Sequence, residues 1–195
     1  MSVTLCRLVA VHGGEGVELY LNVDGEQRSL VLSANDCVEL GLMRGELSDG
    51  IFNEIERRAA AYAARRAALR ILAAGKCSQK QLAQKLRARR FSAQDAAAAA
   101  AYAAEKGYID ERWQVENYVE TLFFNKGYGP RKIRPFLLQK GYAPDEIDRA
   151  IAEKIDGDRL AAAKAAFLKK KFGKTKPQSY EEAAAFRAAL YRNGF

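Results

Sequence analysis

The sequence holds little of what metal centres, disulfide frameworks and membrane anchors require. Its 195 residues include one histidine and three cysteines, and Cys6, Cys37 and Cys77 lie far apart with no Cys-x-x-Cys pair. Neither a zinc site nor a disulfide framework is therefore indicated, and we expect buried thiols. No stretch approaches the roughly 18 consecutive apolar residues of a membrane-spanning helix, and residues 1–7 lack the layout of a signal peptide. We therefore expect a soluble, cytoplasmic protein.

A recognisable catalytic constellation is also absent. His12 has no neighbouring residue with which it would form a triad or a metal site. Residues 173–175 resemble the end of a phosphate-binding loop, but the earlier glycine that this motif needs is missing. The acidic pairs at 110–111 and 145–146 precede predicted helices, where negative charge complements the helix dipole. We predict a protein that is not an enzyme and that has no catalytic residues, cofactor or metal ion.

What the sequence has in excess is positive charge, and this charge is unevenly distributed. The formal net charge is +8. Residues 1–58 carry 5 basic and 10 acidic side chains, whereas residues 59–195 carry 27 and 14. Such a change of sign indicates two modules, the larger of which faces a polyanion or an acidic protein surface. A solvated helical surface explains the charge equally well, so charge alone leaves both interpretations open.

The first 47 residues have the pattern of a small strand module. Apolar and polar side chains alternate on either side of Asp24-Gly25, a pair that favours a tight two-residue hairpin turn. The apolar run over residues 3–11 indicates a third strand, and Ser33 is a suitable N-cap for a short helix. Three strands and one helix bury little by themselves, so we expect this module to dock on the chain that follows.

After Ser48 the composition is that of helices, and the sequence repeats itself. A shift of 51 positions aligns Ser78 with Gly129, Leu82 with Ile133, Leu86 with Leu137, Arg89 with Lys140, Phe91 with Tyr142 and Ala96 with Ile147. A shift of 53 positions then aligns Ile133 with Phe186, Leu137 with Leu190, Gly141 with Gly194 and Tyr142 with Phe195. Each copy is predicted to consist of three helices, with the aromatic residue after the turn packed back on the core.

We predict a mainly α fold in which tandem three-helix repeats form an elongated curved solenoid, preceded by a small three-stranded β module with a short helix. The expected parts are a strand-rich N-terminal module (1–47), a first helical repeat with its lead-in helix (48–110), a second three-helix repeat (111–157) and a third repeat that is incomplete at the C-terminus (158–195). The missing last helix fits either an abbreviated final unit or a longer protein cut short, and the sequence does not decide between them.

Basic residues gather at matching places in the three copies and are the candidate binding residues. They are Lys85, Arg87, Arg89 and Arg90 in the first copy, Lys126, Arg131, Lys132, Arg134 and Lys140 in the second, and Lys169, Lys170, Lys171, Lys174 and Lys176 in the third. Contacts with phosphates release counterions, so such residues bind DNA without regard to its sequence and with a strong dependence on salt. The alternative is that they are ordinary solvated side chains on helix surfaces.

Two further features of these regions point to nucleic acid. Gly127, Gly129 and Pro130 place Arg131 and Lys132 at a predicted helix start, where backbone amides would also hold a phosphate. Tyr128 and Phe172, which we expect in loops, are candidates for stacking on bases. By contrast, we expect core positions for the aromatics that repeat in register with the apolar face, Phe91 and Tyr142.

These features resemble the RecX family, the bacterial regulators of the RecA recombinase. The resemblance covers about 128 residues and depends on the order and spacing of short motifs. The matching positions are Ala68-Leu69-Arg70, Ser78, Leu82, Lys85-Leu86, Phe91, Gly107-Tyr108-Ile109-Asp110-Glu111, Tyr118-Val119, Gly129, Ile133, Leu137 and Lys140-Gly141-Tyr142. The sequence departs from the family pattern at Trp113, where phenylalanine is usual, and at Asp110-Glu111, where two aspartates are usual.

The resemblance implies a regulator in DNA repair, recombination and the SOS response. Such a regulator binds the RecA nucleoprotein filament and mainly inhibits its recombinase, coprotease and ATPase activities. The implied partners are the RecA filament and single- and double-stranded DNA, bound by a monomer without sequence specificity. Two other interpretations stay open: a helix-turn-helix-like protein that acts on DNA without RecA, and a protein-interaction scaffold that does not contact nucleic acid.

Overall fold

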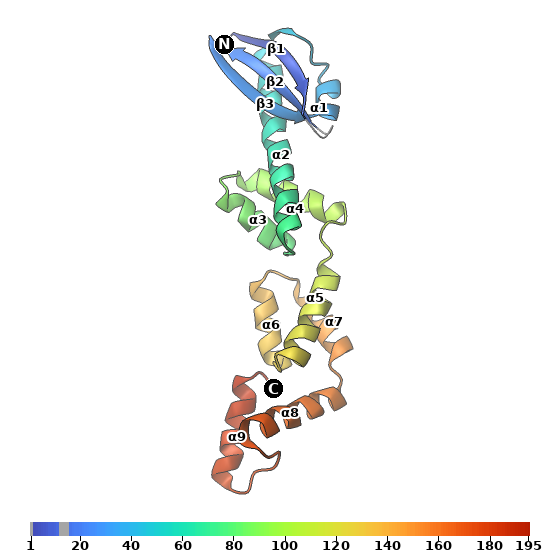
Figure 1. Cartoon of the computed structure of the whole chain (residues 1–195), viewed down its shortest axis with the longest axis vertical. Coiled ribbons are helices and arrows are strands. Elements are labelled where there is room, and N and C mark those ends of the chain that lie inside the picture. Colours follow the sequence, from blue (N-terminus) through green and yellow to red (C-terminus); the bar gives the residue numbers. More distant parts are fainter. Residues whose placement is uncertain (1, 12–15) are drawn as a thin grey trace. The chain divides into compact units, whose positions relative to one another are not determined.

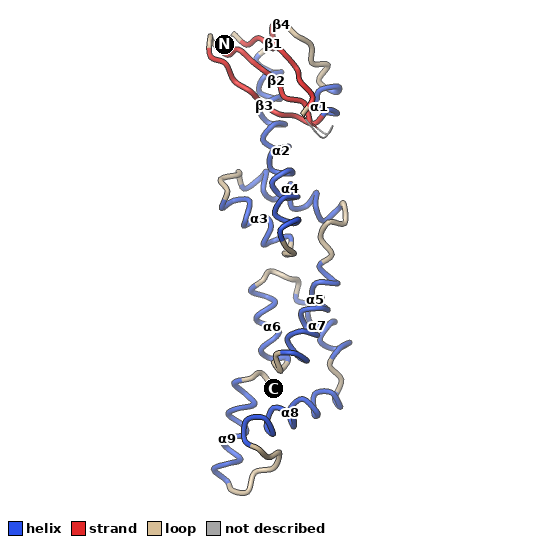
Figure 2. Tube along the Cα trace, viewed as in Figure 1, coloured by secondary structure: helices blue, strands red, loops and turns tan. Residues whose placement is uncertain are grey.

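The computed structural model describes residues 2–11 and 16–195, which are mainly helical with one small antiparallel sheet (Figures 1 and 2). The strands are β1 (Val3–Ala10), β2 (Gly16–Val23), β3 (Glu26–Ser33) and β4 (Gly45–Leu47). The helices are α1 (Ala34–Glu39), α2 (Asp49–Ala74), α3 (Gln79–Ala88), α4 (Ala93–Glu105), α5 (Glu111–Glu120), the π-helical turn η1 (Thr121–Asn125), α6 (Pro130–Gln139), α7 (Pro144–Lys154), α8 (Gly157–Phe172) and α9 (Tyr180–Arg192). The predicted mainly α fold class is confirmed. His12 lies outside the described residues.

The chain divides into two compact units. The first consists of Met1–Gly75 and Leu82–Tyr108, and the second of Lys76–Gln81 and Ile109–Phe195. The four parts predicted from the sequence are a finer division than these two units. Whether each of those parts folds as a separate domain stays a prediction.

The sheet has the strand order β3-β2-β1-β4, and all neighbouring strands are antiparallel. The hairpin between β2 and β3 turns at Asp24 and Gly25, whose φ angles are +50° and +93°. Two consecutive positive φ angles are what a two-residue type I′ turn requires, and Asp-Gly is among the pairs that adopt them. The prediction of three strands omitted β4, because a strand of three residues is too short for its side chains to show an alternating pattern.

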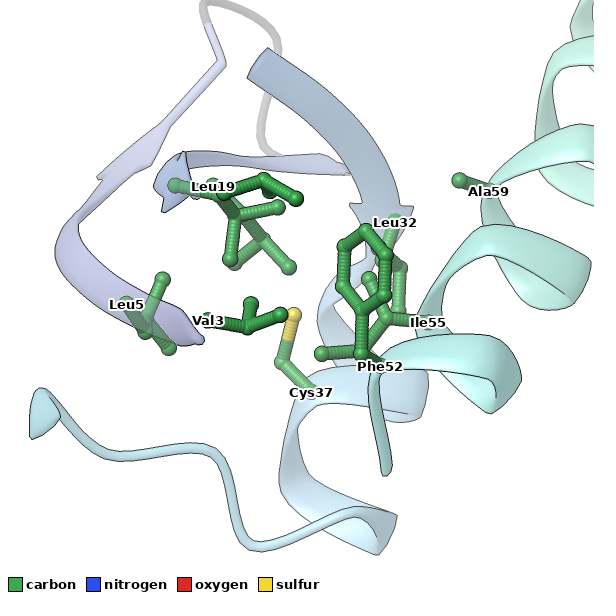
Figure 3. Close-up of a cluster of buried hydrophobic side chains, with 10 residues drawn as sticks. Val3, Leu5, Leu19, Leu32, Cys37, Phe52, Ile55 and Ala59 are labelled. Atoms are coloured by element: carbon green, nitrogen blue, oxygen red, sulfur yellow. The ribbon is translucent and has the colours of Figure 1, made fainter. Parts of the chain in front are cut away.

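One face of the sheet packs on the first half of α2. Val3, Leu19 and Leu32 from the strands form a buried cluster with Phe52 and Ile55 from α2 (Figure 3). The alternation of buried and less buried residues along β2 follows from the two-residue period of a strand. As predicted, the N-terminal module docks on the helix that follows it and completes its core with side chains of that helix.

The three cysteines differ in their surroundings. Cys37 and Cys77 are buried, as predicted, whereas Cys6 on β1 is exposed. The expectation for Cys6 was wrong because Val3 and Leu5 point into the core, so the two-residue period of the strand directs Cys6 to the opposite, exposed face.

Arg58 of α2 joins that helix to α1 by a network of ion pairs. Its guanidinium lies 2.8 Å from the Asp36 carboxylate, 2.7 Å from that of Glu39 and 2.7 Å from that of Glu54. Hydrogen bonds from Arg57 and Arg58 lower the pKa of Glu54 from its ordinary 4.5 to about 2. Burial raises the pKa of Asp36, but hydrogen bonds, including one from Arg58, bring it below the ordinary value.

Acidification is therefore expected to destabilise the first unit between about pH 4.5 and pH 2. Carboxylates whose pKa is depressed in the folded state contribute stability above their unfolded pKa, and this contribution is lost as the pH falls through the folded value. Arg58→Gln removes the cation that Asp36, Glu39 and Glu54 share but leaves Arg57 bonded to Glu54, so we expect it to flatten the acid dependence in part and to lower the thermal midpoint at neutral pH. Thermal denaturation followed by circular dichroism over this range measures both effects.

Arg70→Gln is the control, because Arg70 is an exposed arginine of the same helix with no acidic partner among the described residues. An acid dependence that is the same in Arg58→Gln as in the unchanged protein would contradict the prediction.

Helices α3, α6 and α9 end in the same type of turn. The residues Arg90, Gly141 and Gly194 have φ angles of +68°, +88° and +87°. In each turn the next backbone N–H donates to a carbonyl five residues earlier: Phe91 to Leu86 at 3.3 Å, Tyr142 to Leu137 at 3.3 Å and Phe195 to Leu190 at 3.0 Å. This arrangement is the Schellman motif that caps helix C-termini. The shifts of 51 and 53 positions predicted from the sequence are therefore present in the backbone.

In the first copy this turn has arginine where the other two have glycine. A residue with a Cβ atom in the left-handed conformation costs about 1–2 kcal/mol, part of which is offset by the larger unfolded-state entropy of glycine. We expect Arg90→Gly to stabilise the protein by about 0.5–1 kcal/mol, measured by urea denaturation. Arg90→Ala is the control, because it removes the charge but keeps the Cβ atom. Equal stabilisation by both variants would attribute the effect to the charge and would contradict the prediction.

Candidate binding surface

Two of the candidate basic residues are already paired with acidic side chains. The guanidinium of Arg134 donates two hydrogen bonds to Asp148, at 2.7 and 3.0 Å. The Lys174 ammonium lies 2.7 Å from a carboxylate oxygen of Glu182. Hydrogen bonding to these cations lowers the pKa of both carboxyl groups. Arg134 and Lys174 therefore serve contacts inside the second unit, which makes them the weakest of the candidates for binding an external anion.

The first cluster lies at the end of α3 and in the turn after it. Lys85, Arg87, Arg89 and Arg90 are all exposed, and none has an acidic partner among the residues that the structure describes. Lys85 and Arg89 are one helical turn apart and line the same shallow depression. Positive charge at a helix C-terminus is also favourable to the helix dipole. The cluster therefore stabilises its own helix while its charges stay accessible.

The second cluster contains exposed cations without an acidic partner and cations that lie over aromatic rings. Lys126 and Arg131 are exposed and have no acidic partner in the described part of the chain. Lys132 and Lys140 each lie over a ring, with the Lys132 ammonium 3.8 Å from the centre of the Tyr128 ring. Cation–π contacts fix the position of an ammonium group without neutralising it. The charges of Lys132 and Lys140 are therefore held in place next to the surface.

The predicted phosphate site at the start of α6 is wrong. The backbone N–H of Arg131 donates to the Gly194 carbonyl at 3.0 Å, and that of Lys132 donates to the Gly129 carbonyl at 3.0 Å. The N–H of Gly129 donates to the Asn193 carbonyl at 2.8 Å. The amides that were expected to hold a phosphate are satisfied by the end of α9 and by the first turn of α6 itself. An oxyanion would have to displace these bonds.

The third cluster is the densest and the most open. Lys169, Lys170 and Lys171 occupy the last turn of α8, and Lys176 lies in the loop after it. All four are exposed, and no acidic partner is found for them within residues 2–11 and 16–195. The positive charge at this place is therefore concentrated and accessible, and its role in binding stays a prediction.

The aromatic candidates have different outcomes. Phe172 was expected in a loop, but it is the last residue of α8, and its ring stacks on Phe186 of α9 with the centroids 4.5 Å apart. Tyr128 lies in the connection between η1 and α6, as expected, and its ring is half buried. Tyr142 is buried and donates a hydrogen bond to the Gln114 side chain at 2.8 Å. Its burial raises the pKa of the phenol, and its predicted core role is confirmed.

Asp110, of the acidic pair 110–111, is the N-cap of α5, as the sequence predicted, whereas Glu111 binds the start of another helix. The Asp110 carboxylate accepts a hydrogen bond from the backbone N–H of Trp113 at 2.9 Å. Glu111 accepts one from the backbone N–H of Gln79, at the start of α3, at 2.7 Å.

In the described residues, no helix is long and apolar enough to cross a membrane, and no group of three or more potential metal ligands occurs.

The second unit also contains a groove that the sequence analysis missed. It lies between η1 and α8, has a volume of about 730 Å³, and we call it the Phe124 groove. Lys126 from the second cluster and Lys170 and Lys171 from the third line it together. The Phe124 ring is 55% exposed there, whereas Phe123 beside it is buried. The sequence feature that indicates this groove is the pair of consecutive phenylalanines after α5. A π-helical turn has no periodic sequence pattern by which it could be predicted, although such turns often occur at functional sites.

Comparison with known proteins places the chain among bacterial regulators. No protein-family model matches the sequence. The regulatory protein RecX of Halorhodospira halophila (strain DSM 244 / SL1) is 35% identical over 140 residues, which cover 72% of this chain and 85% of that protein. The regulatory protein RecX of Legionella pneumophila (strain Corby) is 34% identical over 128 residues, which cover 66% and 83% of the two chains.

Two solved structures have the same fold. A crystal structure of regulatory protein RecX matches with a TM-score of 0.80 at 19% identity, covering 99% of this chain and 94% of that one. A crystal structure of RecX from Lactobacillus salivarius matches with a TM-score of 0.60 at 20% identity, covering 70% and 88%. The fold likeness and the sequence relatives agree, and the chain therefore belongs to the RecX family of regulatory proteins.

Proposed function

We propose that this protein binds the RecA nucleoprotein filament and inhibits its recombinase, coprotease and ATPase activities without being an enzyme. In this proposal it acts as a cytoplasmic monomer and contacts single- and double-stranded DNA without sequence specificity. Family membership supports a regulatory role, because its relatives are named regulatory proteins. The name RecX and the resemblance of the motifs support RecA as the target.

The observation that carries the proposal is that exposed cations without acidic partners occur in all three copies of the repeat. Among the described residues they include Lys85 and Arg89 in the first copy, Lys126 and Arg131 in the second, and Lys169 to Lys171 in the third. A recombinase filament is a helical polymer that carries DNA, so its charge recurs at regular intervals. Repeated cations on one chain suit such a target.

The same cations also suit a protein that binds bare DNA without RecA, and one experiment separates the two functions. The protein is added to preformed RecA filaments on single-stranded DNA, and ATP hydrolysis is recorded as its concentration rises. Binding to bare single- and double-stranded DNA is measured in parallel at several salt concentrations. We expect inhibition of ATP hydrolysis at protein concentrations too low to occupy bare DNA.

Each contrary result identifies another function. Binding to bare DNA with no effect on RecA would replace the proposal by the DNA-binding alternative. Indifference to DNA and to salt, together with no effect on RecA, would leave a protein-interaction scaffold. Inhibition that follows the occupancy of bare DNA at every salt concentration would show competition for DNA and no recognition of the filament.

A further inference from the structure

We propose that the Phe124 groove binds an acidic amphipathic helix of a protein partner. The groove has an apolar floor, a rim of positive charge and, within the described residues, no acidic lining residue. This inference deepens the proposed function and rests on it, because it names the chemistry that cations of the second and third clusters recognise.

The α8 wall of the groove is a straight stripe along the helix. Arg159, Ala163, Ala166 and Lys170 line it and follow one another at intervals of three or four residues. This spacing keeps the residues on one helix face, and at 1.5 Å per residue the two cations lie about 16 Å apart along the axis. Alanine side chains between them allow another helix to approach closely.

The opposite wall comes from the π-helical turn. The ring of Phe123 is buried in the core of the second unit and packs edge-on against the ring of Phe124, with the centroids 4.9 Å apart. Phe124 is thereby held in place while more than half of its surface stays exposed. An apolar side chain of a partner would lie between Phe124 and the alanines of α8, where its surface would leave water.

The charges on the rim select an acidic partner. Lys126, Lys170 and Lys171 line the groove and have no acidic partner among the described residues. Arg159 also lines it, although its guanidinium is 3.4 Å from Asp156. Charge complementarity contributes to the specificity and the association rate of an interface more than to its affinity. A helix with carboxylates about eleven positions apart and apolar residues between them fits this arrangement.

The groove is less suited to nucleic acid. A DNA strand carries one charge per ~3.4 Å of helix axis, whereas the cations at the two ends of the α8 stripe are separated by methyl groups. Ala163 and Ala166 offer no aromatic face on which a base would stack and no hydrogen-bond donor for a phosphate. Phe124 is the one exposed large aromatic side chain among the described lining residues.

The test uses the full chain and a labelled synthetic peptide, without RecA. The peptide is an alanine-rich helix of about 16 residues, with two glutamates about eleven positions apart and two leucines between them. Binding is followed by fluorescence anisotropy. We expect the acidic peptide to bind, a peptide with lysines in place of the glutamates not to bind, and Lys170→Glu to weaken the acidic peptide about tenfold or more.

Lys169→Glu is the matched control. Lys169 is the neighbouring lysine in the same helical turn, is also exposed and does not line the groove. We expect this variant to bind the acidic peptide within about twofold of the unchanged protein. Phe124→Ala is the second test variant, because truncating an exposed ring leaves the core intact while removing the apolar wall. We expect Phe124→Ala to weaken binding of the acidic peptide by about the same factor as Lys170→Glu does.

Three results would overturn the inference. The first is an equal loss in Lys169→Glu and Lys170→Glu, which would mean diffuse attraction. The second is displacement of the peptide by an oligothymidylate whose own binding is lost in Phe124→Ala, which would make the groove a nucleic-acid site. The third is absence of peptide binding while RecA inhibition is intact. Peptide binding in a protein that does not inhibit RecA would support the groove and contradict the proposed function alone.

Discussion

Replacing Gly129 by alanine is expected to destabilise the second unit by about 2–4 kcal/mol. A Cβ atom at this position would lie 2.2 Å from the carbonyl oxygen and 2.3 Å from the carbonyl carbon of Gly194. These are backbone atoms, and they move away only if two hydrogen bonds break. The bonds run from Gly129 N–H to the Asn193 carbonyl, at 2.8 Å, and from Arg131 N–H to the Gly194 carbonyl, at 3.0 Å. The end of α9 is therefore expected to detach from the start of α6.

Urea denaturation measures the loss of stability, and hydrogen exchange over residues 180–195 shows whether α9 opens first. Gly157→Ala is the control in the same unit, because nothing lies within 4 Å of its added Cβ atom. Gly157 is the first residue of α8, where alanine is a better helix former, so this variant is expected to be as stable or slightly more stable. An unchanged denaturation midpoint for Gly129→Ala would refute the account of this contact.

The requirement for glycine at position 129 becomes clear from the repeat. The position equivalent to Gly129 in the first copy is Ser78, whose hydroxyl donates to the Lys140 carbonyl at 2.7 Å. Lys140 in turn is equivalent to Asn193, which accepts from Gly129. The start of one copy's helix thus contacts the end of the next copy's helix in both places. One contact is made by a side chain and the other by the backbone itself, which leaves no room for a Cβ atom.

The features that were predicted correctly from the sequence depend on interactions between residues that are close to one another in the chain. The hairpin turn depends on the φ angles that Asp24 and Gly25 adopt, and the helix starts depend on the side chains of Ser33 and Asp110. The apolar spacing of each copy gave the helices and the buried position of Tyr142. In each case the interaction is local, or it follows from a periodicity that the sequence displays directly.

The features that were missed depend on partners distant in the sequence. The amide of Arg131 is satisfied by Gly194, and the guanidinium of Arg134 is held by Asp148, so a count of positive charges overstates the open cations. Strand β4 also depends on a distant partner, because it forms only by pairing with the edge of β1. The Phe124 groove needs a π-helical turn facing α8, an arrangement that no short motif specifies.

Reversing the charge of Lys169, Lys170 and Lys171 to glutamate is expected to weaken inhibition of RecA filaments roughly 10- to 100-fold. An exposed ion pair contributes about 0.2–1 kcal/mol, and reversal adds repulsion, so three adjacent changes amount to about 1.4–2.8 kcal/mol. The log–log salt slope of binding to single-stranded DNA should fall by at least about 0.7, the contribution of one phosphate contact, because Lys169 lies outside the Phe124 groove. ATP hydrolysis by preformed filaments, titrated with the variant, gives the first quantity, and binding at several salt concentrations gives the second.

Two further variants distinguish the loss of the local contact from effects of the substitutions on helix stability and on net charge. Glutamate at the end of α8 opposes the helix dipole, so the triple change to glutamine, which removes charge without adding repulsion, should show a smaller loss of inhibition at unchanged helix content. Changing Arg44, Arg70 and Arg187 to glutamate alters the net charge by the same amount at exposed positions outside the clusters. If this scattered variant loses as much inhibition as the cluster variant, long-range attraction to the filament explains the binding, and the third cluster has no special part in it. If it retains inhibition while the cluster variant loses it at a helix content that circular dichroism shows to be equal, the contact lies at the end of α8, because the net charge is the same in both proteins.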